Sequence, residues 1–317
     1  MWYFCNKFES PIRLDGKTAI ITGGNTGIGK ETAKDFYLRG ARVLILCRNE
    51  EKAKNAIEEI KKDCEKNENK GEIVQKYLDL EILFCVRTCA NEILIEENRI
   101  DILVNNAGVF GHSEHKTKDG FEMHFGVNYL GHFLLTFLLL PKLRQSKNAK
   151  IINLTSVIHK VPYWGGKLDL DDINLEKKPY SSMMGYVQSK LELILFTKEL
   201  DRRLKRANIN NVSVYSVHPG VVATEIGRNF NVYVYGLHWI WKILSQTVLI
   251  SPKQGAQTTI YCAISDGIES GLYYSNCAVS NPSSVTEDEE KSAKLWDMSI
   301  IFLCLQDYNP FVKHLAL

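Results

Sequence analysis

Apolar residues along the chain gather in short runs that alternate with longer segments of helical periodicity. Within each run the apolar residues are largely consecutive, which is typical of a strand covered on both faces. The runs lie at 18–22, 42–47, 72–80, 100–108, 150–156 and 212–220. Helical segments follow them, the first at 27–39 and a charged second at 50–66. This alternation predicts an α/β fold, a doubly wound parallel sheet with helices on both faces and a ligand at the carboxyl ends of the strands.

The same pattern places the chain in a single domain of Rossmann type. We expect this domain to run from 14 to 307, after an N-terminal extension (1–13) and before a C-terminal tail (308–317). No internal repeat or low-complexity linker interrupts it. The longest apolar run, 133–141, is far shorter than the about 20 residues that span a bilayer, so it predicts a buried helix.

Four glycines lie between the first strand and the first helix, in the segment GGNTGIG at 23–29. Glycine leaves the backbone bare there, and the amides and dipole of the helix N-terminus favour a nucleotide pyrophosphate. A plain tight turn is the alternative explanation. As a nucleotide-binding loop, the segment supplies the candidate cofactor-binding residues Gly23, Asn25, Thr26, Gly27, Ile28 and Gly29.

The ends of the next strands bear on the choice of nucleotide. In dinucleotide folds an acidic residue there receives the ribose 2′-hydroxyl of NAD, whereas an arginine accommodates the 2′-phosphate of NADP. This chain has Cys47 where the acid would stand and Arg48 directly after it, which favours NADP(H). Asp79 and Leu80 end the third strand and are candidates to bond and flank an adenine, with a helix cap as the alternative for Asp79. The small turn after the fourth strand, where backbone must approach a ribose, adds Asn106, Ala107 and Gly108.

A second group of candidate residues lies further along the chain. Tyr186 and Lys190 are four residues apart on an expected helix at 185–204, a spacing that puts both side chains on one face. Such a pair alone is common on protein surfaces. Ser156 at the end of the fifth strand and Asn128 in the segment GVNYLGHF add two polar side chains upstream of the pair. Together with the glycine loop, these residues predict an active site.

Composition narrows the classes of partner. The formal net charge is only +2, from 39 basic and 37 acidic residues, so the chain carries no strong field for nucleic acid. Eight cysteines scattered through 317 residues favour reduced thiols in the cytoplasm over a disulfide scaffold. Cys85 and Cys89 lie four residues apart, but no second pair follows at zinc-site spacing, so we expect no metal.

Several segments together resemble the short-chain dehydrogenase/reductase family, and within it the microsomal NADP-dependent retinol dehydrogenases. They are DGKTAIITGGNTGIGKETA, GARVLILCR, DILVNNAGV, DGFEMHFGVNYLGHFLLT, VHPGVVATEI and LWDMS, and they extend over residues 14–307. The resemblance implies a catalytic tetrad of Asn128, Ser156, Tyr186 and Lys190. It also implies that the cofactor contacts Tyr186, Lys190, Pro219, Gly220 and Thr224.

This resemblance implies an NADP(H)-dependent oxidoreductase that interconverts retinol and retinaldehyde, or similar lipid alcohols and aldehydes, by hydride transfer. Tyr186 would act as general acid or base, with its phenolate stabilised by Lys190. Ser156 would orient the substrate oxygen, and Asn128 would hold a water beside Lys190. A steroid or xenobiotic carbonyl is an alternative substrate. A non-catalytic NADP-binding scaffold or redox sensor is a further alternative, against which the intact tetrad argues.

The region from 221 to 250 is unusually rich in phenylalanine, tyrosine and tryptophan. It predicts a helical substrate lid for a long apolar ligand, or a dock on a membrane surface. Residues 1–10 contain no anchor like that of the related dehydrogenases. We therefore expect a cytoplasmic protein, with peripheral contact to the endoplasmic reticulum membrane. Apolar faces near 130–140 and 187–200 suit a homodimer as well as burial within one chain.

Overall fold

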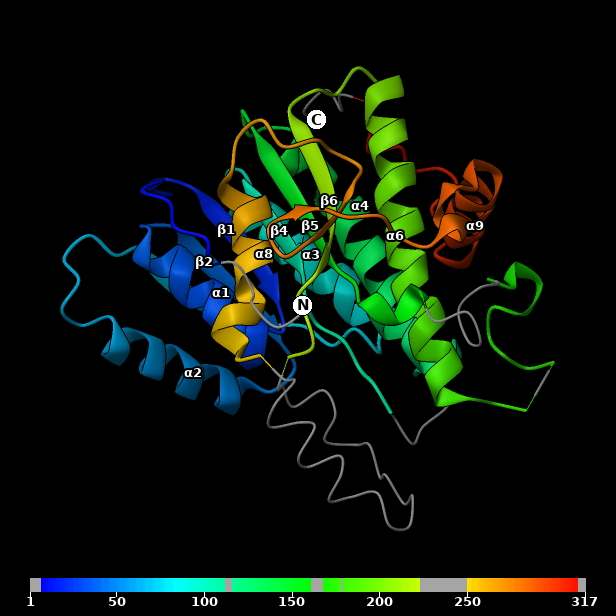
Figure 1. Cartoon of the computed structure of the whole chain (residues 1–317), viewed down its shortest axis with the longest axis horizontal. Helices are drawn as coiled ribbons and strands as arrows, with labels where there is room; N and C mark the ends of the chain where they lie inside the picture. The colour runs from blue at the N-terminus through cyan, green and yellow to red at the C-terminus, as the bar shows by residue number, and fades with distance from the viewer. Residues whose placement is uncertain (1–6, 112–115, 161–167, 178, 223–249, 313–317) are drawn as a thin grey trace, which may run out of the picture.

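The computed structural model describes residues 7–111, 116–160, 168–177, 179–222 and 250–312. At its centre is an eight-stranded sheet in the order β3-β2-β1-β4-β5-β6-β7-β8, parallel except for the last pair (Figure 1). The strands are β1 (Thr18–Thr22), β2 (Arg42–Cys47), β3 (Glu72–Tyr77), β4 (Ile102–Asn105), β5 (Ala149–Leu154), β6 (Val212–His218), β7 (Tyr273–Ser275) and β8 (Ala278–Val279). The chain moves from β1 outward to β3 and returns to β4 on the other side of β1. This reversal between β1 and β4 is the point at which such sheets bind ligands.

The first six strands confirm the predicted doubly wound sheet. β3 ends at Tyr77 and β4 at Asn105, three residues earlier than expected in each case, because the residues that follow leave the sheet. All residues of β1, β4 and β5 are buried, as their consecutive apolar positions predict. β7 and β8 were not predicted, since strands of three and two residues are too short to show a period.

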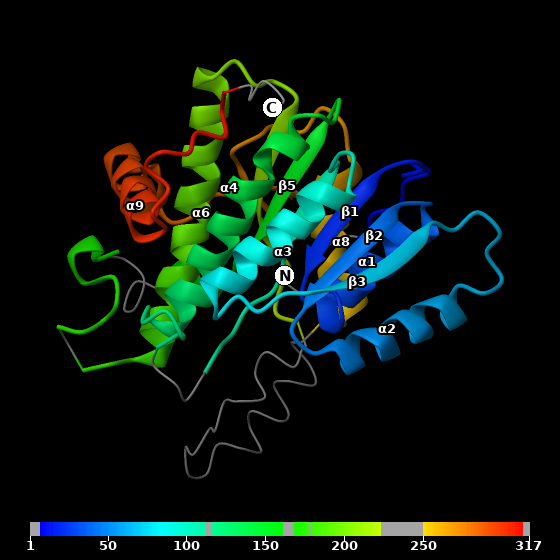
Figure 2. The same ribbon diagram turned by 180° about the vertical axis from the view of Figure 1, so that it is seen from behind.

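Helices cover both faces of the sheet, as Figures 1 and 2 show from opposite sides. One face carries α1 (Gly27–Leu38), α2 (Glu50–Asp63) and α8 (Pro252–Ile264). The other carries α3 (Leu83–Glu96), α4 (Gly131–Leu143) and α6 (Ser182–Arg206). The prediction also missed α8, although its capping box of Ser251 and Gln254, with Pro252 at the first turn, is a helix-start signal. Each helical layer has its own apolar core against the sheet.

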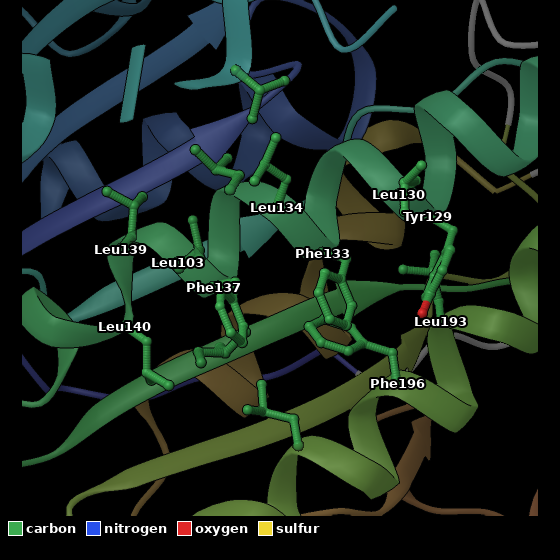
Figure 3. Close-up of a cluster of buried hydrophobic side chains, with 14 of the residues drawn as sticks. Leu103, Tyr129, Leu130, Phe133, Leu134, Phe137, Leu139, Leu140, Leu193 and Phe196 are labelled. Carbon is green, nitrogen blue, oxygen red and sulfur yellow. The ribbon is translucent and has the colours of Figure 1, made fainter. Parts of the chain in front are cut away.

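One more helix, α9 (Glu289–Phe302), lies outside α6 and away from the sheet (Figures 1 and 2). It closes the apolar cluster of α4 and α6 in which Figure 3 shows Phe133 and Phe196. Trp296 of α9 lies edge-on to Phe133, with 4.8 Å between ring centroids, and 5.9 Å from Phe196. The apolar run 133–141 is therefore buried in a helix, as predicted. The two faces considered for a homodimer are covered within the chain.

Most of the aromatic lid expected at 221–250 lies outside the described residues, because the segment 223–249, which also contains Thr224, is not among them. Over the ranges that the structure does describe, no helix combines the length and the apolar character needed to cross a membrane. Residues just before β1 pack on the α8 layer, where the rings of Phe8 and Tyr261 meet with 5.1 Å between centroids. Part of the N-terminal extension is thus attached to the domain.

Candidate active site

The turn from β1 into α1 has a conformation that depends on glycine. Gly23 and Gly27 have φ of +66° and +54°, in the left-handed region that other residues rarely adopt. A Cβ on Gly29 would lie 2.3 Å from the Gly23 carbonyl oxygen and 2.5 Å from Asn106 Nδ2. The glycines therefore let the loop pack directly against the segment after β4. The other predicted loop residues, Asn25, Thr26 and Ile28, are half-buried in the same turn.

The first turn of α1 has no side-chain cap. Its N-cap residue, Thr26, accepts no hydrogen bond through its side chain, whereas Asn49, Ser181, Ser251 and Asp288 cap α2, α6, α8 and α9 in this way. The first turn of α1 also contains no acidic residue. Because the first N–H groups of a helix lack partners within it, an uncapped N-terminus attracts an anion. The bare loop and the uncapped helix fit the pyrophosphate of a dinucleotide.

At the carboxyl ends of β2 and β3, Arg48 meets a buried carboxylate. Arg48 Nη1 donates to Oε1 of Glu81, whose side chain is 10% exposed, while that of Arg48 is 50% exposed. Asp79 makes a local turn, in which its Oδ1 accepts the Glu81 N–H at 3.0 Å. Leu80 is buried in the core and lies against Gly131 of α4. Glu81 was not among the predicted site residues, although it directly follows two of them.

Thr22, at the end of β1, holds the segment after β4. Its Oγ1 accepts the N–H groups of Asn106 and Ala107, both at 2.9 Å. Asn106 in turn donates from Nδ2 to the Thr22 carbonyl at 2.8 Å. Gly108 follows so closely that a Cβ on it would be 3.2 Å from Asn128 Oδ1. The residues predicted after β1 and β4 are thus in one place, at the point where the strand order reverses.

Asn128 lies in a π-helix, Phe125–Leu130, directly before α4, and is fully buried. Its Oδ1 accepts the Val109 N–H at 2.8 Å, and its Nδ2 donates to the Val109 carbonyl at 3.2 Å. The same Nδ2 donates to Ser189 Oγ at 3.0 Å. Ser189 Oγ donates to the Tyr186 carbonyl at 2.8 Å. Asn128 therefore fixes the loop after β4 to the start of α6.

Tyr186 and Lys190 share one face of α6, as their spacing predicts. Lys190 is 3% exposed, and its Nζ lies 5.6 Å from the centroid of the Tyr186 ring and donates to the Leu154 carbonyl at 3.0 Å. Burial lowers the pKa of Lys190 to about 8. Burial also raises the pKa of Tyr186 to about 12, although a hydrogen bond with Ser156 opposes this shift. The residues of the predicted tetrad are therefore gathered beside the carboxyl ends of β4 and β5.

The turn after β6 contains Pro219 and Gly220, two of the residues predicted to contact the cofactor. Gly220 has φ of +89°, and a Cβ on it would be 2.6 Å from Ile250 Cδ1. Pro219 precedes it in the same half-buried turn. Since β6 is the neighbour of β5 in the sheet, this turn lies at the same edge as the tetrad. Thr224 lies outside the described residues, so its contact stays a prediction.

His132 of α4 is fully buried between two of these groups and was not predicted to belong to the site. Its Nε2 lies 2.9 Å from Thr22 Oγ1, and its Nδ1 lies 2.8 Å from the Asn128 carbonyl oxygen. Burial lowers the pKa of His132 to about 4, so the ring is neutral at physiological pH. Its place four residues after Asn128 on one helix was the available signal.

Several known proteins are similar to this chain in sequence. The short chain dehydrogenase family model matches residues 17–168. Retinol dehydrogenase 11 of Mus musculus is 42% identical over 298 residues, which cover 93% of this chain and 89% of the relative. Retinol dehydrogenase 12 of Mus musculus is 43% identical over 297 residues, with the same two coverages. The likeness to these relatives thus extends over most of both chains.

Solved structures show the same fold. An uncharacterised protein from Mycobacterium paratuberculosis matches with a TM-score of 0.72 and 29% identity, over 92% of this chain and 95% of that one. The complex of Pseudomonas aeruginosa RhlG with NADP at its active site matches with a TM-score of 0.64 and 23% identity, over 84% of this chain and 97% of that one. At 23% identity the second likeness concerns the fold alone.

Proposed function

Because the chain belongs to the short-chain dehydrogenase/reductase family, whose members are oxidoreductases that use a nicotinamide cofactor, we propose that it uses NADP(H) to interconvert retinol and retinaldehyde or similar lipid alcohols and aldehydes. The observation that carries this proposal is the gathering of Ser156, Tyr186 and Lys190 at the sheet edge that also holds the uncapped start of α1. The retinoid class rests on the names of the relatives. When bound, the nicotinamide supplies or accepts the hydride.

Tyr186 exchanges the proton. With a pKa of about 12 it is a neutral phenol at physiological pH, the form that donates a proton to a carbonyl oxygen during reduction. Ser156, which is hydrogen-bonded to Tyr186, holds that oxygen beside the phenol. Lys190 is positively charged below its pKa of about 8 and stabilises the phenolate that remains. Oxidation of an alcohol uses the same groups in reverse.

Asn128 acts in this scheme by fixing the site. Both donors of its amide are used, one by the Val109 carbonyl and one by Ser189. The family resemblance implies that Asn128 holds a water beside Lys190. Such a water can form a hydrogen bond only with the remaining lone pair of Oδ1. We assign to Asn128 the task of holding the loop after β4 at a set distance from α6.

The choice of NADP(H) rests on Arg48. Its guanidinium is half exposed at the end of β2, where a 2′-phosphate would be received, and Cys47 takes the place of the carboxylate that selects NAD. The guanidinium is paired with Glu81, whose carboxylate would compete with a 2′-phosphate for it. Specificity constants should favour NADPH over NADH by at least about tenfold, which is about 1.4 kcal/mol.

The partitioning of the proposed substrate into membranes suggests the cellular location of the protein. Retinoids partition into bilayers, so we propose a cytoplasmic enzyme that docks reversibly on the endoplasmic reticulum membrane through its aromatic segment between Phe230 and Trp241. The full-length protein should co-sediment with liposomes and be released by mild detergent. Exchange of Trp239 and Trp241 for serine should abolish co-sedimentation. Undiminished liposome binding by that variant would contradict the docking role of these residues.

The test of the proposed function is NADPH consumption with a panel of retinal isomers, medium-chain aldehydes and keto-steroids. The proposal predicts the highest kcat/KM for a retinal isomer or a long-chain aldehyde. A steroid as the best substrate would move the protein to the alternative class of carbonyl reductases. NADP⁺ binding without turnover of any carbonyl or alcohol would instead indicate a scaffold or redox sensor.

A further inference from the structure

A chain of buried hydrogen bonds runs from the start of the proposed cofactor loop to Asn128 through a single side chain, His132. The ring lies between Thr22 Oγ1, at 2.9 Å from Nε2, and the carbonyl oxygen of Asn128, at 2.8 Å from Nδ1. All three residues are fully buried. Thr22 ends β1 directly before the glycine loop, and Asn128 lies in the π-helix before α4. The imidazole therefore spans two parts of the site that are more than a hundred residues apart in sequence.

The partners of His132 determine its tautomer. A carbonyl oxygen can only accept, so the Nδ1 that faces Asn128 must carry the proton. The ring is neutral, because burial lowers the pKa of His132 to about 4, although its hydrogen bond to the Asn128 carbonyl opposes this shift. Its Nε2 is then an acceptor, and the only hydrogen that Thr22 can offer it is that of its hydroxyl. Each hydrogen bond in the chain thus has a defined direction.

With the hydrogen bonds in this direction, the Thr22 hydroxyl uses its one hydrogen and both of its lone pairs. Its hydrogen lies closer to His132 Nε2, at 2.9 Å from Oγ1, than to the other acceptor in reach, the Val104 carbonyl at 3.5 Å, and its two lone pairs accept the N–H groups of Asn106 and Ala107. Rotation of the hydroxyl toward any other acceptor would leave Nε2 of His132 unpaired in a buried place. The neutral imidazole therefore fixes the Thr22 hydroxyl, and through it the backbone that faces the cofactor.

We propose that His132 is a positioning residue that couples the cofactor loop to Asn128, with one ring nitrogen serving each. Its role rests on the proposed function, in which Asn128 sets the distance between the loop after β4 and α6. Through Nδ1 it holds the Asn128 carbonyl and so the π-helix. Through Nε2 it holds Thr22, and with it the backbone of Asn106 and Ala107. Neither nitrogen contacts substrate.

Two amide substitutions separate the two contacts. In His132→Asn the side-chain amide can take the place of Nδ1 and keep the contact to Asn128, while the contact to Thr22 is lost. In His132→Gln the longer side chain can take the place of Nε2 and keep the contact to Thr22, while the contact to Asn128 is lost. Thr136→Val is the matched control, because Thr136 is equally buried one turn further along α4 and accepts from Asn105, outside this chain of bonds.

The readouts are the Kd of NADP⁺ by calorimetry and kcat for the best carbonyl of the panel. His132→Asn should weaken NADP⁺ binding by about threefold or more and lose more affinity than turnover. His132→Gln should lower kcat by about tenfold or more and lose more turnover than affinity. Thr136→Val should show no such split between Kd and kcat. Equal losses in Kd and kcat for both His132 variants would overturn the proposal and leave His132 as a packing residue.

Two further measurements keep the test decisive if an amide variant is too unstable to study. In a double-mutant cycle, Thr22→Val combined with His132→Asn should weaken NADP⁺ binding no more than Thr22→Val alone, whereas additive losses would overturn the coupling. The ¹⁵N chemical shifts of wild-type His132 should show a neutral ring protonated at Nδ1. The opposite tautomer would overturn the proposal even in an active enzyme. The expected tautomer in a protein that turns over no substrate would refute the proposed function and not the hydrogen-bond chain.

Discussion

In the proposed site, the end assigned to the adenosine and the end assigned to catalysis are built from different interactions. At the adenosine end, Arg48 is half exposed and its contact to Glu81 is ionic. At the catalytic end, Asn128 and Lys190 are buried, and each bonds to the backbone: Asn128 Oδ1 accepts the Val109 N–H at 2.8 Å and Lys190 Nζ donates to the Leu154 carbonyl at 3.0 Å. The first end can exchange partners with solvent and ligand, whereas the second is fixed before any ligand arrives.

This difference determines how much free energy a substitution is expected to cost at each end of the site. A solvent-exposed ion pair contributes about 0–1 kcal/mol, because water and salt screen it. A buried donor or acceptor left without a partner costs about 1–3 kcal/mol, and loss of a positioned proton donor costs more in rate. We therefore expect changes at the catalytic end to act on turnover, and changes at the adenosine end to act on the choice of cofactor.

The largest effect is expected for Tyr186→Phe, which removes the proton donor and keeps the ring. Turnover should fall by roughly 10²–10⁴-fold, the usual contribution of a positioned acid or base, with little change in the Kd of NADPH. Tyr180→Phe is the control, since it removes a nearby hydroxyl that donates to Glu122 at 2.9 Å and belongs to no tetrad. Near-normal turnover by Tyr186→Phe on a confirmed substrate would show that another group donates the proton.

Lys190→Ala should come next. A positive charge near a phenolate shifts its pKa by about 1–3 units, so its loss should lower turnover by about 10–10³-fold. NADPH affinity should fall as well if Lys190 also bonds the cofactor ribose, as the family resemblance implies. Lys198→Ala on the same helix, which removes a lysine paired with Glu287 near the surface, is the control. Equal kinetics for the two variants would contradict the assignment of Lys190.

The pH dependence of reduction should show the titration of Lys190. Its pKa is lowered by burial to about 8, so the positive charge is present below that pH and is lost as the pH rises through it. Tyr186, with its pKa of about 12, keeps its proton over this range. The rate of carbonyl reduction at saturating NADPH should therefore fall above about pH 8. In Lys190→Arg, whose charge persists, an active variant should lack that fall, and an unchanged profile would assign the titration to another group.

The smallest effects are expected at the adenosine end. Arg48→Asp should remove or reverse the preference for NADPH, a change of about 1.4 kcal/mol for each tenfold. Glu81→Gln removes a negative charge beside the site of the 2′-phosphate, so it should raise that preference by about threefold, in the range of an exposed ion pair. Lys54→Asp on the exposed face of α2 controls for net charge. A lower preference in Glu81→Gln would mean that Glu81 chiefly orients Arg48.

The parts of this site that follow from local sequence were predictable. The glycine loop lies between a strand and a helix, and Tyr186 and Lys190 lie one helical turn apart, so spacing alone places them. The buried strands were equally visible as consecutive apolar runs. In each of these cases the residues that interact are close together in the chain or belong to one regular element.

The parts that were missed depend on contacts between distant segments. Glu81 and Arg48 are 33 residues apart, and Thr22 and His132 are 110 apart, so no local pattern joins either pair. His132 also lies in a largely apolar helix, and its spacing from Asn128 gives no sign of its other partner, Thr22. β7 is held by pairing with β6, and β8 by pairing with β7, rather than by a period of their own. Contacts between segments so far apart in the chain can be recognised only in the folded structure.

The measurement that tests the account most directly is a paired determination of NADP⁺ affinity and retinaldehyde turnover in Tyr186→Phe and Arg48→Asp. We predict opposite profiles: Tyr186→Phe should lose turnover by roughly 10²-fold or more with NADP⁺ affinity nearly retained. Arg48→Asp should lose NADP⁺ affinity by about tenfold or more, with a much smaller loss of turnover at saturating cofactor. Parallel losses of affinity and turnover in both variants would contradict the division of the site into a cofactor-selecting end and a catalytic end.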